Sequence, residues 1–213
     1  FLMDSRFNSP AEIASLVSKS GVTKSMLSLP KMILLGLMAG AFIAFGGAAS
    51  DVAMHGVADV GLARVVAGVI FPVGLMLVVF TGSELFTGNC LMIIPTLEKK
   101  IKVASMLRNL VVVYISNFVG AMIIDLLITF SGQLNYSNGG LGAFTIKVAL
   151  AKTTINPATA IISGILCNIL VCLAIVMATG ATDAIGKIFG VFFPICAFVV
   201  CGFEHCVANM FYI

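Results

Sequence analysis

Two short stretches, GSELFTGN at residues 82–89 and GFEHCVAN at residues 202–209, decide the fold of this chain. Both read G-x-E-x-x-x-x-N, and they begin 120 positions apart inside runs that are otherwise apolar. A Phe-Pro pair precedes each stretch, at 71–72 and at 193–194. Interrupted apolar segments at corresponding positions of two halves are typical of inverted repeats that hold a site near the middle of a membrane.

The composition around these stretches is that of an integral membrane protein. Of the 213 residues, 60% are hydrophobic and 10% are charged, and the mean hydropathy is +1.15. Soluble domains carry about 25% charged residues, and long apolar runs predict spanning helices rather than a barrel. We therefore expect an all-α membrane bundle, one domain over 1–213, with spans at about 31–51, 65–94, 103–130, 158–180 and 188–213.

Residues 9–20 predict an amphipathic helix that precedes the first span. Ser9 and Glu12 have the spacing of a capping box, and Pro10 suits the first helical position. We expect this helix to lie along the membrane surface or against the bundle. Lys19 in this helix, and Lys24 and Lys31 after it, are expected near lipid headgroups.

The placement of basic residues predicts the orientation in the cell membrane. The positive-inside rule assigns the more basic side to the cytoplasm, which places the N-terminus there. The loops at 52–63 and 131–155 then face outward. Nine of the twelve basic residues fall on the cytoplasmic side: Arg6, Lys19, Lys24, Lys31, Lys99, Lys100, Lys102, Arg108 and Lys187.

The inverted-repeat hypothesis assigns the first three spans to one copy and the last two to most of a second copy, whose third span is absent. The first span carries Gly36 and Gly40, a G-x-x-x-G spacing that lets helices approach closely. Packing within one bundle is favoured over a subunit interface for this pair.

The polar side chains shared by the two interruptions are expected to support the breaks. Ionisable groups at mid-membrane depth cost about 2.5–3.5 kcal/mol on insertion scales, so they need partners. We favour Glu84 and Glu204 as acceptors for backbone N–H groups freed at the breaks, over direct contact with a substrate. Asn89 and Asn209 are predicted to brace the same breaks.

His205 has no counterpart in the first repeat, where Leu85 is aligned. Its unperturbed pKa of about 6.5 suits proton exchange, so we predict a functional role for it. Lys152, just before the fourth span, is either a pore-entrance cation or a solvated loop residue, and the pattern favours neither.

The pattern predicts no metal site and no cofactor. The six cysteines form no C-x-x-C pair, and with two histidines they match no zinc or iron–sulfur spacing. We expect them to be free thiols used in packing. We also expect no nucleic-acid partner, only a small substrate and the lipid bilayer.

Three motifs, at 82–89, 164–178 (GILCNILVCLAIVMA) and 202–211, closely resemble the formate/nitrite transporter family. The resemblance implies an aquaporin-like, inverted-repeat, six-helix bundle that forms a homopentamer with a pore in each subunit. It implies passage of small monovalent weak-acid anions (formate, nitrite or hydrosulfide), with a weak lean to hydrosulfide. The family's sixth helix is absent from this chain, which stops at NMFYI, residues 209–213.

The resemblance also carries over candidate site residues one by one. The family's central histidine falls on His205, followed by Cys206 where serine is usual. Matching positions imply pore and substrate contacts at Thr87, Asn168 and Lys152. Hydrophobic constrictions are implied at Phe71 and Phe198 on the outer side and at Leu75 and Leu85 on the inner side, with Val171 also lining the pore.

Together these residues suggest a mechanism. Lys152 draws an anion inward, the apolar rings oppose a bare charge, and a proton on or near His205 lets the anion cross as its neutral acid. Asn168 is expected to orient the imidazole; in the simpler alternative, His205 only sets pore polarity. The rival classes are a membrane-embedded enzyme, which lacks G-x-S-x-G and H-E-x-x-H motifs, and a non-conducting scaffold.

Overall fold

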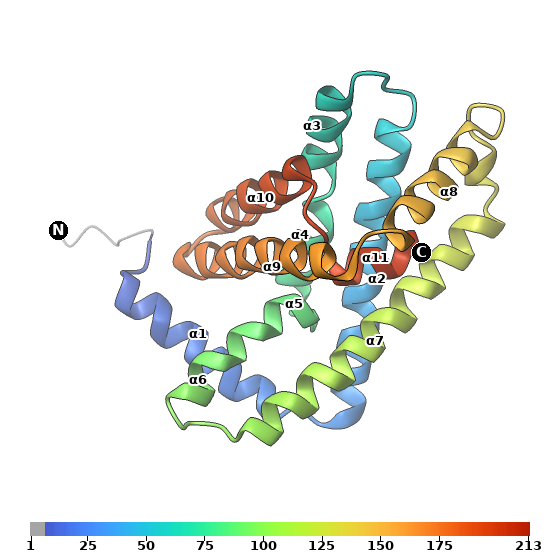
Figure 1. Cartoon of the computed structure of the whole chain (residues 1–213). Coiled ribbons are helices and arrows are strands. Elements are labelled where there is room, and N and C mark those ends of the chain that lie inside the picture. Colours follow the sequence, from blue (N-terminus) through green and yellow to red (C-terminus); the bar gives the residue numbers. More distant parts are fainter. Residues whose placement is uncertain (1–6) are drawn as a thin grey trace.

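The computed structural model describes residues 7–213, which fold into helices joined by short turns (Figure 1). An isolated antiparallel bridge joins Phe7 to Ala181. The helices are α1 (Pro10–Ser25), α2 (Leu29–Met54), α3 (Val60–Ile70), α4 (Val73–Thr81), α5 (Phe86–Asn89), α6 (Ile93–Leu97), α7 (Val103–Phe130), α8 (Gly140–Thr153), α9 (Pro157–Gly180), α10 (Ala184–Cys201) and α11 (Cys206–Tyr212), with 3₁₀ turns η1 (Cys90–Met92) and η2 (Gln133–Asn135).

Five helical segments within the described residues are long and apolar enough to cross a membrane. This agrees with the predicted all-α membrane fold. They are Leu29–Met54, Val60–Thr81, Val103–Phe130, Pro157–Gly180 and Ala184–Cys201.

The bundle has two ends, each marked by the short helices that lie there. In Figure 1, α1 and α6 lie at the lower end, which we call the α1 side. The start of α3 and the helix α8 lie at the upper end, which we call the α8 side. The chain passes repeatedly between these two sides.

Helix α1 docks on the bundle rather than standing apart from it. The predicted capping box is present, with Ser9 and Glu12 bonded reciprocally. The helix packs against α9 and α6, and the backbone N–H of Asn8 donates to the carbonyl of Gly180 at 2.8 Å. Arg6, one of the basic residues that predicted the orientation, lies outside the described residues.

The small residues of α2 pack against α7 inside the bundle. A Cβ atom on Gly40 would lie 2.0 Å from the carbonyl oxygen of Asn117, and one on Gly120 would lie 2.0 Å from the carbonyl oxygen of Leu37. The two backbones therefore touch where only glycine fits. This confirms that the G-x-x-x-G pair serves packing within the chain.

Both interruptions are real helix breaks with the same geometry. Helix α4 ends at Gly82, with φ 68° and ψ 27°, and α10 ends at Gly202, with φ 73° and ψ 29°. This left-handed conformation costs glycine little. Three residues then run without helical structure to Leu85 and His205, both extended, before α5 and α11 begin.

The connection at 131–155 contains helical structure that was not predicted from the sequence. This stretch contains η2 and the 14-residue helix α8, which carries Lys152 in its last turn. The segment GLGAFTIKVALAKT is too short to span a bilayer, which takes about 20 residues, so its apolar residues do not indicate a span. The helix packs against η2 and α11.

Candidate functional site

A hydrogen bond between the two repeats lies at the centre of the bundle. Thr87 Oγ1 and His205 Nε2 are 3.1 Å apart, and the two residues are only 3% and 4% exposed. The other ring nitrogen, Nδ1, accepts from the backbone N–H of Ala208 at 2.9 Å and caps α11. Because Nδ1 is an acceptor, the hydrogen of the neutral imidazole sits on Nε2, and it donates to Thr87.

Two phenylalanine rings cover His205 on one side. The rings of Phe71 and Phe198 meet edge to face with centroids 5.6 Å apart. Phe198 stacks on the imidazole at 5.7 Å, and Phe71 meets it at 6.5 Å. The predicted outer constriction and the predicted central histidine are therefore brought together.

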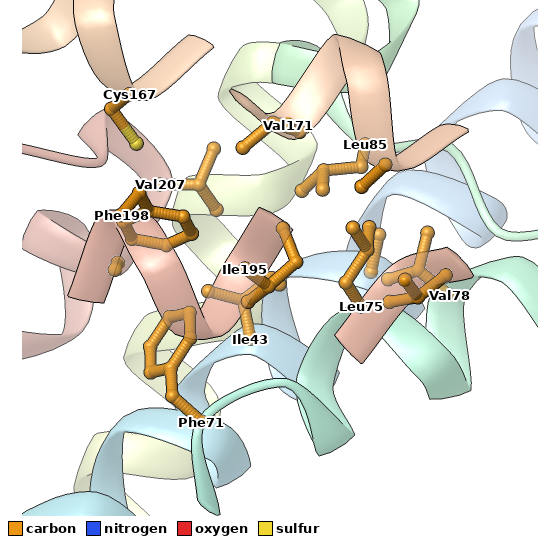
Figure 2. Close-up of a cluster of buried hydrophobic side chains, with 14 of the residues drawn as sticks. Ile43, Phe71, Leu75, Val78, Leu85, Cys167, Val171, Ile195, Phe198 and Val207 are labelled. Atoms are coloured by element: carbon orange, nitrogen blue, oxygen red, sulfur yellow. The ribbon is translucent and has the colours of Figure 1, made fainter. Parts of the chain in front are cut away.

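The other predicted constriction residues belong to the same buried cluster. Leu75, Leu85 and Val171 are 1–2% exposed and pack in one hydrophobic core with Phe71 and Phe198. Figure 2 shows that Leu75 and Leu85 lie together, apart from the two phenylalanine rings. We call these two groups of side chains, which belong to one buried core, the apolar closures.

Asn168 lines a cavity of about 780 Å³ together with Thr87 and His205. Its Oδ1 atom is buried and has no hydrogen-bond partner among the described residues. The prediction that Asn168 orients the imidazole was wrong, because Thr87 and Ala208 take both ring nitrogens. Asn168 instead offers an unused polar group to the cavity.

The first helix break is held by a lysine from α1. Lys24 Nζ lies 2.8 Å from Glu84 Oε1 and donates to Asn89 Oδ1 at 2.8 Å. Asn89 in turn donates to Glu84 Oε2 and to Asn109 Oδ1, both at 2.7 Å. The prediction of Lys24 at lipid headgroups was therefore wrong: its ammonium group neutralises a buried carboxylate.

The second break has the same arrangement on the opposite side. Lys152 Nζ lies 2.7 Å from Glu204 Oε2, and Asn209 donates to that same oxygen at 2.8 Å. The ammonium group also lies 5.4 Å above the ring of Tyr212. Lys152 is thus a half-buried ion-pair partner, which excludes the solvated-loop interpretation.

The prediction that the two glutamates accept backbone N–H groups at the breaks was wrong, because their oxygens bind side chains. Other groups serve the backbone. Asn117 Oδ1 accepts from the N–H of Phe86 at 2.9 Å, and Asn117 Nδ2 donates to the carbonyl of Glu84 at 2.9 Å. At the second break, Ser163 Oγ accepts from the N–H of Glu204 at 2.9 Å.

Sequence reasoning missed Lys24, Asn109, Asn117 and Ser163. The two asparagines carried a readable signal, since each is an amide inside the apolar run of the third span, and a buried amide needs partners. Lys24 and Ser163 had no such signal, because their partners lie 60 and 41 positions away.

The thiols and acidic groups show no arrangement for metal binding. Within residues 7–213, no group of three or more His, Cys, Asp or Glu residues could hold a metal ion. All six cysteines are free. Cys206, next to His205, and Cys172 both line the cavity that Asn168 also lines.

Spanning helices, two mirrored breaks and a buried polar pair beside an apolar core are typical of a helical membrane transport protein. The model of the family described as "Formate/nitrite transporter" matches residues 11–213. This chain belongs to the formate/nitrite transporter family, whose members similar to it are channels and transporters rather than enzymes.

Similar proteins include a "Probable formate transporter" of Methanothermobacter thermautotrophicus, 42% identical over 99% of this chain and 84% of that protein. A solved "FNT family ion channel" matches with a TM-score of 0.85 and 30% identity over 95% of this chain and 81% of that one. A "Pentameric formate channel with formate bound" matches with a TM-score of 0.78 and 34% identity, over 86% and 72%.

Proposed function

We propose that this chain forms, as one transmembrane domain, a channel for small monovalent weak-acid anions, with formate as the first candidate. The observation that carries the proposal is the buried Thr87–His205 hydrogen bond, which joins the two helix breaks beside the rings of Phe71 and Phe198. The names of the similar formate channels support the choice of anion. The lean to hydrosulfide stays a prediction, which the same flux panel tests.

In the proposed mechanism, Thr87 makes the central contact with the anion. Its oxygen accepts from His205 Nε2, so its own hydroxyl hydrogen is free to donate. An anion oxygen that meets this hydrogen recovers part of the hydration it loses among apolar side chains. Asn168 lines the same cavity, where its unpaired Oδ1 atom can accept a hydrogen bond from the neutral acid form of the substrate but not from the anion.

The apolar closures give a reason for proton coupling. Moving a bare carboxylate into apolar surroundings is expensive, whereas its neutral acid crosses more easily. The Phe71–Phe198 pair and the Leu75, Leu85 and Val171 group would oppose the charged form. We propose that the anion takes up a proton near His205, with the ring returning to the neutral state that caps α11.

The proposal extends to assembly and orientation. We propose a homopentamer, because a similar solved protein is named a "Pentameric formate channel with formate bound". We propose that the α1 side is cytoplasmic in the cell membrane, which follows from the basic residues near α1 and between α6 and α7. Lys24 then pairs with Glu84 at the cytoplasmic break, and Lys152 pairs with Glu204 at the outer break.

Flux into proteoliposomes tests the function. Purified protein should pass formate, nitrite and hydrosulfide at rates well above those of empty liposomes, and should exclude chloride, which is not the anion of a weak acid. Thr87→Val keeps the shape of the side chain and removes the hydroxyl, and should lower formate flux about tenfold. A protein that passes none of the weak-acid anions would be the scaffold that the rival hypothesis describes.

A further inference from the structure

The cation best placed to collect anions on the α8 side is Arg64, rather than Lys152. We infer that Arg64 is a recruiting and specificity residue for the anion pathway, an inference that rests on the proposed function. Four observations support this inference. They are the contacts of Lys152, the position of Arg64 on α3, the packing of Arg64 against the second helix break, and the lack of a counter-ion for Arg64 within residues 7–213.

Lys152 has little charge left to offer a passing anion. Its ammonium group lies 2.7 Å from the carboxylate of Glu204, and the two side chains are only 18% and 15% exposed. A close, half-buried pair acts on a distant ion as a dipole rather than as a net positive charge. Lys24 is neutralised by Glu84 in the same way on the α1 side.

Arg64 begins the face of α3 that leads to the phenylalanine closure. Residues 64, 67, 68 and 71 follow the i, i+3, i+4, i+7 spacing of one helix face. Ala67 and Phe71 on this face are 2% and 3% exposed, whereas Arg64 is exposed. At 1.5 Å per residue, Arg64 stands about 10 Å from Phe71 towards the α8 side.

The guanidinium group lies against the second helix break. A Cβ atom on Gly202 would be 3.0 Å from Arg64 Nη1 and 3.2 Å from Cζ. The carbonyl groups that end α10 are the negative end of that helix and favour a cation beside them. This contact holds the charge beside the loop that leads to Glu204 and His205.

Arg64 has no hydrogen bond and no ion pair with any residue in 7–213. Two carboxylates at this end of the bundle are engaged elsewhere or enclosed. Asp59 caps α3 by accepting from the N–H of Leu62 at 2.7 Å, and Asp51 is 2% exposed. A free guanidinium with two parallel N–H groups suits a planar carboxylate or nitrite better than an ammonium group does.

The consequence is a local excess of anions around Arg64, beside the second helix break. A fixed charge beside a narrow, low-dielectric entrance raises the local concentration of counter-ions and the rate at which they enter. Removal of that charge should weaken apparent binding and leave the passage through the centre unchanged. The effect should therefore appear in KM rather than in the maximal rate.

The test measures initial formate flux against formate concentration in proteoliposomes. Arg64→Gln should raise KM about three- to tenfold with the maximal rate unchanged, and Arg64→Lys should recover much of the loss for formate. Lys147→Gln removes the same charge from an exposed position on α8 and should change KM less than twofold. At about 1 M salt, where the Debye length is about 3 Å, wild type and Arg64→Gln should converge.

The outcomes separate the inference from the proposed function. If wild type passes no weak-acid anion, the proposed function fails and the inference fails with it. If wild type conducts but Arg64→Gln has an unchanged KM, or has an effect that persists in high salt, only the inference is overturned. The salt-insensitive result would assign Arg64 to packing against Gly202.

Discussion

Thr87 Oγ1 and His205 Nε2 are 3.1 Å apart although the residues are separated by 118 positions. Each follows the glycine at which its own half of the chain leaves helical geometry. The two breaks therefore do more than interrupt helices, because they carry one polar group from each repeat to a common point. The backbone N–H of Ala208 then fixes which nitrogen of the imidazole faces Thr87.

His205→Asn separates proton exchange from helix capping. Asparagine is among the best N-cap residues, so α11 should keep its cap when the titratable ring is lost. If the imidazole exchanges protons with the anion, His205→Asn should flatten the dependence of formate flux on pH. The measurement is initial flux at several pH values, with equal protein incorporated.

His205→Phe is the companion variant, since it removes both the cap and the hydrogen bond to Thr87. We expect it to reduce flux more strongly than His205→Asn does. An unchanged pH profile in both variants would show that His205 sets pore polarity only. The Thr87 contact with the anion would survive that result.

Lys24→Met should destabilise the protein more than a double change does. The variant leaves Glu84, whose side chain is 4% exposed, without its cation, and a broken buried pair costs several kcal/mol. Because Lys24 itself is 25% exposed, we expect a loss of about 2–3 kcal/mol in the free energy of unfolding. Adding Glu84→Gln should restore at least about 1 kcal/mol.

Thermal unfolding in detergent measures both proteins under the same conditions. If the double variant is less stable than Lys24→Met by as much as Glu84→Gln alone destabilises the wild-type protein, the two side chains do not interact. Lys19→Met, an exposed lysine on the same helix, is the matched control and should stay within about 0.5 kcal/mol of wild type.

The contact between α1 and Glu98, at the end of α6, should weaken in acid. Ser18 donates to Glu98, Lys100 Nζ lies 2.9 Å from the same carboxylate, and these contacts hold the pKa of Glu98 below its usual value. A carboxyl group with a lowered pKa contributes stability above its ordinary pKa of about 4.3, and that contribution disappears as the pH falls through the lowered value.

Glu98→Gln should therefore lower the melting temperature at neutral pH, and the gap to wild type should close as the pH falls below about 4. The measurement is thermal unfolding of both proteins across that range. A gap of constant size at every pH would show that the charge on Glu98 does not contribute, and that only the shape of the side chain does.

Much of the fold could be predicted from the sequence because its signals are local. Gly82 and Gly202 stand where the polar residues begin in each apolar segment, and each has the positive φ that ends its helix. The capping box of Ser9 and Glu12 needs only a spacing of three residues. Helix α8 was missed because its 14 residues are too few to indicate a span.

The partners within the site were harder to predict because they depend on docking. The sequence repeat identifies Glu84 and Glu204 as corresponding residues. It does not identify their lysine partners, which come from α1 and α8. The role of Asn168 depended on which atoms reach His205, and two other groups reach it first. A pattern in one chain reports spacing along a helix, whereas these contacts are set by how helices pack.

Gly40→Ala tests the close packing that positions the first break. A Cβ atom there would lie 2.0 Å from the backbone oxygen of Asn117, so α2 and α7 must separate. Asn117 also holds the N–H of Phe86, and a shift of α7 should disturb Thr87 one residue further on. We expect a loss of about 3 kcal/mol in the free energy of unfolding together with reduced flux. Gly56→Ala, where nothing lies within 4 Å, should leave both unchanged; equal behaviour of the two variants would mean that α7 adapts without cost.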